Sequence, residues 1–162
     1  MGLRPYRTGQ TAGGSFKNHF PFENADAVYC SDLKRAVDTA ALLSDIKPVI
    51  DKRLRERSLG DFEGRLIGEI ESDPCYEKYF TNPEYTEFRH GFSAKAPGGE
   101  NYTDVCKRVS SFLNELDRNL NKVIIVSHFC AIRCIIKTVK SLSEEETLKL
   151  KIYNCDPIIL NI

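Results

Sequence analysis

The chain has 162 residues, of which 41% are hydrophobic and 28% are charged, a composition typical of one globular domain. Lysine plus arginine and aspartate plus glutamate number 23 each, and this balance argues against nucleic acid or an anionic membrane as the main partner. No apolar run approaches the length of a membrane span and no apolar signal segment opens the chain, so a cytoplasmic protein is expected.

The first clear pattern is "DAVYCSDLKRAVDTAALLSDI", which predicts a strand, a turn and a helix. A short apolar run covers residues 27–30, and Ser31 is a plausible N-cap for the helix. Leu33, Val37 and Ala40 then recur at helical spacing. Arg35 falls in the first turn of this helix, where it is either an ordinary exposed charge or a phosphate ligand with a planar fork of donors.

The next informative segment is "RLRERSLGDFEG", in which apolar and charged residues mix before a glycine turn. Glu56 lies in it. Its carboxylate is either half of a surface salt bridge or, if it lies beside a pocket, a general acid.

The second half of the chain predicts further helices and strands. "NYTDVCKRVSSFLNELDRNL" places Val105, Val109 and Phe112 on one face of an amphipathic helix. Residues 123–126 form a continuous apolar run, as a buried parallel strand does, and a turn at Ser127 and His128 leads into another helix. Ser143 and Glu146 match a capping box in "SEEETLKLK", and "IILNI" predicts a final short strand.

Alternating strands and helices predict an α/β domain with a mostly parallel sheet in three layers, α/β/α. Ligands of such sheets bind beyond the carboxyl ends of the strands. Two strands, in "VYCSDLKR" and "VIIVSHF", end in polar residues and could face one pocket. A lone histidine such as His128 is more often a structural residue than a catalyst, and the same holds for Arg35 and Glu56 taken singly.

Taken in order, four segments resemble the histidine phosphatase superfamily of phosphoglycerate mutase-like proteins. "YCSDLKRAVDTA" resembles its "SSxLxRAxxTA" segment and "LRERSLGDFEG" its "LxExxxGxxEG" segment. "PGGENYTDVCKRVSSFL" resembles "PGGESxxxxxxRvxxfl", and "VIIVSHFCAIR" resembles "vlvVsHGxxiR". Within the superfamily the segments are most similar to the fructose-2,6-bisphosphatase and TIGAR-type branch. One departure is Phe129, which stands where the family usually has glycine and could narrow the phosphate pocket.

The resemblance implies a phosphomonoesterase that acts on a small phosphorylated metabolite, such as a sugar bisphosphate. In the family a first histidine attacks phosphorus and becomes phosphohistidine, which water then hydrolyses. By resemblance Arg35 is a phosphate clamp, Glu56 the proton donor to the leaving oxygen, and His128 the second histidine that stabilises the phosphoryl oxygens. The resemblance implies no metal and no cofactor.

The position of the first histidine is open between two alignments. Arg7-Thr8-Gly9 could stand for the family's Arg-His-Gly, with threonine in place of the nucleophile. Alternatively "LRPYRTGQTAGG" matches a later segment, "LTxxGxxQAxxxG". The second alignment is favoured because it needs no large deletion, and because "GLRPYR" is too polar for a central strand.

On the favoured alignment the first central strand and its nucleophile are missing. Unpaired backbone groups would then line a gap in the sheet, which predicts a truncated phosphatase domain over residues 1–162 or an inactive phosphate-binding or interaction module. Arg89-His90-Gly91 repeats the family tripeptide but lies in a polar excursion, from which His90 could contact substrate. His19, in "KNHFPF", is expected in a loop or at a helix end.

The sequence holds six cysteines without a CxxC pair, and free thiols in a reducing compartment are expected. A metal site that joins His128, Cys130 and Cys134 is a weaker alternative, because the spacing matches no structural zinc pattern.

Overall fold

The computed structural model describes residues 24–154 and 156–162. The described sheet has three parallel strands in the order β2-β1-β3, namely β1 (Ala27–Cys30), β2 (Val49–Ile50) and β3 (Val123–Val126). Tyr29 pairs with Val49, and β1 pairs with β3 along its whole length. The predicted α/β class and the two longer strands are confirmed.

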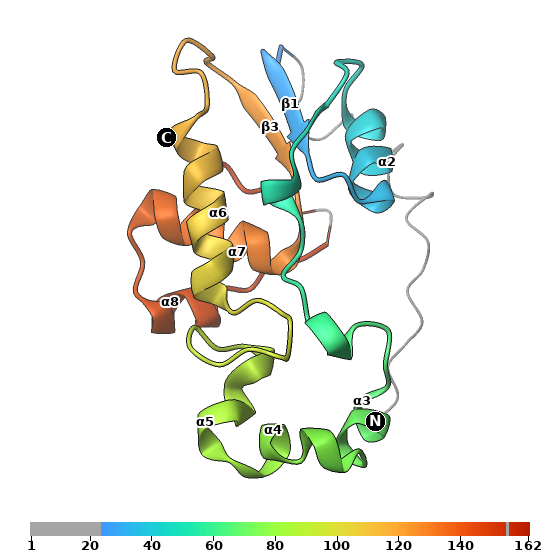
Figure 1. The fold of residues 1–162 in the computed structure, drawn as a ribbon. Coiled ribbons are helices and arrows are strands. Elements are labelled where there is room, and N and C mark those ends of the chain that lie inside the picture. The colour runs from blue at the N-terminus through green and yellow to red at the C-terminus, as the bar shows by residue number, and fades with distance from the viewer. Residues whose placement is uncertain (1–23, 155) are drawn as a thin grey trace.

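Helices cover both faces of this sheet (Figure 1). One face carries α2 (Lys34–Leu43), and its buried Ala36 and Ala40 pack with Val28 and Cys30 of β1. The opposite face carries α6 (Tyr102–Asn114) and α7 (Phe129–Lys140), whose side chains form the main core around Tyr29 of β1. Because alternate residues of a strand point to opposite faces, β1 serves both cores, and the three-layer architecture is confirmed.

No gap separates the three described strands. β1 and β3 are direct neighbours, from the pair Ala27–Val123 to the pair Cys30–Val126. Among the described residues, the sheet is therefore closed between β1 and β3, without a gap of unpaired backbone groups. β3 also differs from a buried central strand, because all four of its residues are only half-buried. Among the described strands, β2 and β3 are the two edges.

The ends of the helices show which local signals decide the structure. The capping box of Ser143 and Glu146 is confirmed at the start of α8 (Glu144–Lys149). Asn101 and Asp104 form a second capping box at the start of α6. The final strand expected in "IILNI" is wrong, because residues 157–162 have no regular structure and pair with no described strand.

The segment between β2 and α6 folds into a separate group of short helices (Figure 1). The part around Arg89-His90-Gly91 is expected to be a polar excursion, yet Phe88 there belongs to an aromatic core, in which the ring of Phe62 makes edge contacts with Tyr79 and Phe88 at centroid distances of 5.2 Å. The elements of the group are η3 (Gly60–Phe62), α3 (Ile67–Glu71), η4 (Pro74–Tyr76), α4 (Lys78–Thr81), α5 (Pro83–Thr86) and η5 (Glu87–Arg89). The preceding η2 (Lys52–Leu54) packs against α6 instead, and its Leu54 belongs to the main core.

Two of the quoted sequence segments lie side by side where this group joins the sheet. The amide of Asp61 donates to the Pro97 carbonyl at 3.0 Å, and the amide of Glu100 donates to the Ser58 carbonyl at 2.8 Å. Gly60 makes this approach possible, because its φ is +54° and a Cβ there would lie 2.1 Å from the Pro97 carbonyl oxygen. The Gly60 turn therefore fixes where the chain around Glu56 lies.

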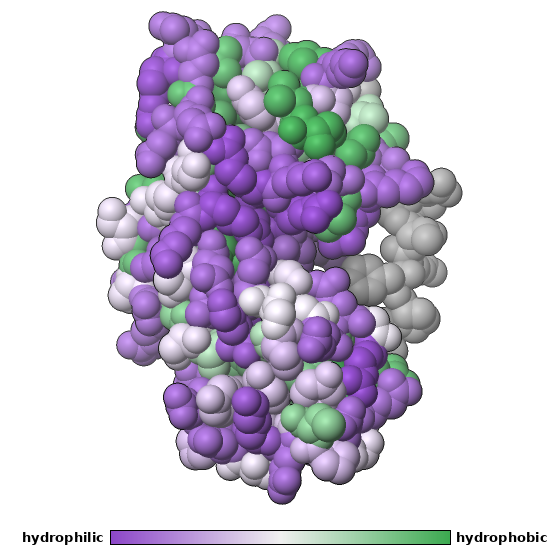
Figure 2. Space-filling view, viewed as in Figure 1, coloured by the Kyte–Doolittle hydropathy of each residue, from purple (hydrophilic) through white to green (hydrophobic). Residues whose placement is uncertain are grey.

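The surface of the molecule is hydrophilic across its middle, between the sheet and the short helices (Figure 2). Apolar side chains gather instead beside the part of the molecule that carries α2 and β2, where Leu42, Val49 and Ile50 are exposed. Among the described helices, none combines the length and the apolar character that crossing a membrane requires.

Candidate active site

Two strand ends meet at the carboxyl edge of the sheet. Ser31 follows β1 and His128 follows β3, and the parallel register places them side by side. The Ser31 hydroxyl lies 2.6 Å from Nε2 of His128, and both side chains are buried. Ser31 is therefore not the N-cap of α2, as the sequence suggested; Leu33 takes that position, and the Ser31 side chain contacts the neighbouring strand end instead.

Arg35 reaches the same histidine from the first turn of α2. Its Nε donates to Nδ1 of His128 at 3.3 Å. A guanidinium is always protonated, so Nδ1 must accept and the ring proton lies on Nε2, which donates to Ser31. Burial and the charge of Arg35 lower the pKa of His128, while the charge of Glu56 opposes this shift. The site therefore holds a neutral imidazole of defined tautomer.

Glu56 lies at the N-terminus of α7, on the same side of the sheet. Its two carboxylate oxygens accept from the amide of Cys130, at 3.0 and 3.3 Å. The amide of Arg57 donates to the same carboxylate at 2.8 Å. Because the first amides of a helix carry partial positive charge, this position favours an anion. The structure thus brings Glu56 next to the helix that His128 precedes.

Arg108 holds this part of the chain in place, and sequence reasoning did not single it out. Its guanidinium pairs with the Glu100 carboxylate at 2.8 and 3.0 Å and donates to the carbonyls of Arg53, Arg55 and Glu56. Burial opposes ionisation of Glu100, but the hydrogen bonds from Arg108 and from the Ser58 amide hold its pKa below the usual value. The arginine in the quoted "PGGESxxxxxxRvxxfl" pattern, which falls on Arg108, was the available signal.

His90 lies at the end of η5, apart from these contacts. Its side chain is exposed and lines a hollow of about 590 Å³. Partial burial lowers its pKa, as do the charges of Arg57, Arg133 and Arg89. In the described part of the chain, no hydrogen bond joins His90 to Arg35, Glu56 or His128. Its role as a substrate contact stays a prediction.

Arg57, directly after Glu56, forms the inner wall of the hollow. Its guanidinium donates to the carbonyls of Phe88, Arg89 and Glu100, and only 8% of the residue is exposed. Its buried Nε has no hydrogen-bond partner. Arg65 and Arg89 line the hollow with it, so cationic side chains predominate there over the single carboxylate of Glu63. The hollow therefore suits a ligand with an anionic group.

Phe129 stands directly after His128, where it was expected to narrow a phosphate pocket. The guanidinium of Arg133 lies over its ring, 4.2 Å from the ring centroid, and 38% of the residue is exposed. The ring thus packs along α7 against the next helical turn. Whether it limits access to His128 stays a prediction.

Other predicted positions are less informative. Arg7, Thr8, Gly9 and His19 lie outside the described residues. The five described cysteines are free thiols, and Cys155 lies outside the description. Within residues 24–154 and 156–162, no group of three or more histidine, cysteine or acidic side chains could hold a metal ion.

Known proteins of similar sequence identify the family to which the chain belongs. Residues 7–162 match the model of the histidine phosphatase superfamily (branch 1). The chain is 30% identical over 135 residues to the Yersinia pestis protein named Probable phosphoglycerate mutase GpmB. The aligned region covers 79% of this chain and 59% of that protein. The chain therefore spans less than two thirds of the length of that relative.

Solved structures share the fold at low sequence identity. An alpha-ribazole phosphatase from Shigella flexneri superposes with a TM-score of 0.69 at 24% identity, over 83% of this chain and 66% of that one. A mycobacterial glucosyl-3-phosphoglycerate phosphatase superposes with a TM-score of 0.68 at 24% identity, over 88% and 72%. With the family model matching almost the whole chain, the conclusion is that this chain belongs to the histidine phosphatase superfamily (branch 1).

Proposed function

We propose that the protein is a phosphomonoesterase of the histidine phosphatase type, acting on a small phosphorylated metabolite through a phosphohistidine intermediate. The observation that carries the proposal is the contact of His128 with both Ser31 and Arg35, at the edge of the sheet where Glu56 also lies. A cation and a neutral imidazole can stabilise phosphoryl oxygens, and a carboxylate can protonate the leaving oxygen; the histidine that attacks phosphorus is a further group that the proposal requires.

Each side chain then has a separate role. Arg35 is exposed and points its donors toward the ring of His128, so a phosphate group could take the place of Nδ1 as its acceptor. His128 would donate from Nε2 to a phosphoryl oxygen, in exchange for Ser31. Glu56 would protonate the leaving oxygen and later take a proton from the attacking water.

The hollow beside Arg57 supports a substrate with a second acidic group, such as a sugar bisphosphate or a phosphoglycerate. Arg57, Arg65, Arg89 and His90 line it, and Arg57 is continuous in sequence with Glu56. The names of the relatives agree with substrates of this class, and one mycobacterial glucosyl-3-phosphoglycerate phosphatase was solved in complex with inorganic phosphate. Membership of the fructose-2,6-bisphosphatase branch, whose substrate would be a sugar bisphosphate, stays a prediction.

A phosphate-binding module without catalysis is the second candidate. In the described residues the ring nitrogens of His128 are both engaged, and His90 follows a short helix rather than a strand. A histidine that attacks phosphorus must point a free ring nitrogen at it. These observations favour a site that binds phosphate while the phosphohistidine step depends on a nucleophile from elsewhere.

The two candidates are separated by measuring turnover and binding on the same samples. Purified residues 1–162 are assayed for hydrolysis of an aryl phosphate between mildly acidic and neutral pH, alongside His128→Ala, Glu56→Gln and His90→Ala. Inorganic phosphate binding is measured by calorimetry. Turnover that His128→Ala abolishes supports the phosphatase, and loss of turnover in His90→Ala would identify His90 as an essential residue.

Binding that Arg35→Ala abolishes, without turnover in the parent chain, supports the binding module instead. Neither turnover nor binding would contradict both candidates.

A further inference from the structure

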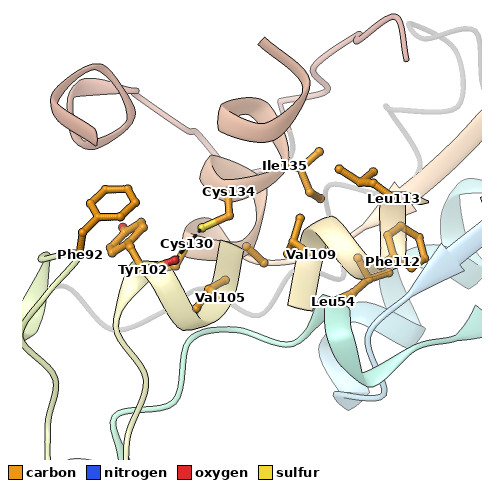
Figure 3. Close-up of a cluster of buried hydrophobic side chains, with 11 residues drawn as sticks. Leu54, Phe92, Tyr102, Val105, Val109, Phe112, Leu113, Cys130, Cys134 and Ile135 are labelled. Atoms are coloured by element: carbon orange, nitrogen blue, oxygen red, sulfur yellow. Dashed lines mark hydrogen bonds between the residues drawn. The ribbon is translucent and has the colours of Figure 1, made fainter. Parts of the chain in front are cut away.

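Two cysteines lie on neighbouring helices at the main core, Cys134 within it and Cys106 packed against it. Cys106 lies on α6 and Cys134 on α7, and these helices pack against each other along the sheet. The Sγ of Cys134 lies 3.7 Å from the carbonyl oxygen of Tyr102, as Figure 3 shows. In an α-helix that carbonyl accepts from the amide four residues later, which is the amide of Cys106. The Cys134 thiol therefore lies against the turn of α6 that carries Cys106.

The general direction of helical side chains places the Cys106 thiol near the same turn of α6. Helical side chains point back toward the N-terminus, over the preceding turn, and for Cys106 this is the turn that contains Tyr102. Cys106 packs against the core cluster to which Cys134 belongs. A disulfide requires two cysteines on closely packed backbones.

The two thiols differ in exposure and in reactivity. Cys106 is half-buried and lines a surface hollow of about 580 Å³, whereas Cys134 is fully buried. The neighbouring Cys134 thiol lowers the pKa of Cys106, and the charges of Lys137 and Arg108 act in the same direction, whereas burial and the charge of Glu144 oppose the shift. The thiolate is the nucleophilic form of cysteine, so Cys106 is the member of the pair suited to attack an oxidant.

We propose that Cys106 and Cys134 are a peroxide-sensitive dithiol that forms a reversible disulfide between α6 and α7. The Cys106 thiolate attacks one peroxide oxygen, the O–O bond breaks, and hydroxide or alkoxide leaves a sulfenic acid on Cys106. The Cys134 sulfur then attacks the sulfenic sulfur, the S–O bond breaks, and water leaves with the Cys134 proton. The two thiols lose two electrons and the peroxide gains them; a dithiol reductant reverses the bond.

The position of the pair connects it to the candidate active site. Arg108, two residues after Cys106, binds the carbonyl of Glu56, and Cys130, one turn before Cys134, donates its amide to the Glu56 carboxylate. The disulfide would join the two helices that hold Glu56 from both sides. The chemistry of the pair does not depend on the proposed function, because it requires only the packing of α6 on α7.

The test is peptide mapping of the full chain after exposure to hydrogen peroxide under native conditions. Free thiols are alkylated, the chain is digested, and cross-linked peptides are identified by mass spectrometry with and without a reductant. The expected result is a Cys106–Cys134 cross-link that the reductant removes, formed at lower peroxide than is needed to oxidise the exposed Cys75. Cys75→Ser is the matched control and leaves the cross-link unchanged.

Cys106→Ser is expected to leave Cys134 alkylatable only after unfolding and to abolish the cross-link. If Cys106→Ser does not fold, the peptide map of the parent chain still tests the proposal by itself. A Cys134–Cys130 bond, a Cys106 that proceeds to sulfinic acid while Cys134 stays free, or oxidation of Cys75 with no change at Cys106 would each overturn the proposal.

Discussion

The hydroxyl of Ser31 lies 2.6 Å from Nε2 of His128, so the ends of two adjacent parallel strands are joined by a buried hydrogen bond. Arg35 occupies the other ring nitrogen at 3.3 Å. A cationic His128 would lose this arrangement, because Nδ1 would have no lone pair to accept from Arg35. The geometry therefore explains why the folded chain keeps the imidazole neutral.

This neutrality predicts that acid destabilises the protein through His128. The unfolded chain binds a proton as the pH falls through about 6.5, whereas the folded chain, in which the pKa of His128 is lowered, does not until the pH is lower still. The free energy of unfolding, measured in urea, is thus expected to fall between about pH 7.5 and about pH 5.5. His128→Gln is expected to flatten this dependence.

His90→Gln is the matched control, since the pKa of His90 is also lowered but its side chain is exposed. We expect it to change the pH dependence less than His128→Gln does. An equal or larger effect of His90→Gln would contradict the assignment of the buried neutral histidine to position 128.

Arg108→Ala is expected to destabilise the fold by about 2–4 kcal/mol, because three backbone carbonyls lose the Arg108 donor and the Glu100 carboxylate keeps only the Ser58 amide. Urea unfolding measures the change. The exposed Arg118 is the control, and Arg118→Ala is expected to change stability by less than about 0.5 kcal/mol. Similar values for the two variants would show that Arg108 does not hold the Glu56 segment.

Comparing Gly60→Ala with Gly64→Ala separates the destabilisation caused by a steric clash from that caused by a positive φ. Both glycines have positive φ, +54° and +73°, so alanine costs each about 1–2 kcal/mol. A Cβ at Gly64 meets open space, whereas one at Gly60 lies 2.1 Å from the Pro97 carbonyl oxygen. Thermal unfolding is therefore expected to show a much larger loss of melting temperature for Gly60→Ala; equal losses would mean that the two segments are not in contact.

Local patterns in the sequence were sufficient for the elements that position the site. The apolar run at residues 27–30, the helical spacing of Val105 and Val109, and the Ser143 capping box each depend on near neighbours in the chain, and each prediction is confirmed. The meeting of the two strand ends could be inferred because parallel strands end at a common edge.

Long-range contacts account for what the sequence did not reveal. Ser31 has the chemistry of an N-cap, but its hydroxyl contacts a histidine 97 residues away. The carbonyls that Arg108 binds at Arg53 and Glu56 are 55 and 52 residues away, so helical periodicity alone does not distinguish that arginine from an exposed charge. The aromatic core of the short helices was missed because Phe62, Tyr79 and Phe88 follow no single period.

The most direct test of the account is an NMR titration of the His128 ring with and without inorganic phosphate. Phosphate bound at Arg35 would offset the positive charge that lowers the pKa of His128. Phosphate is expected to raise the pKa of His128, and Arg35→Gln is expected to abolish this phosphate-dependent rise. A His128 titration curve that is the same with and without phosphate would contradict a phosphate site at this sheet edge.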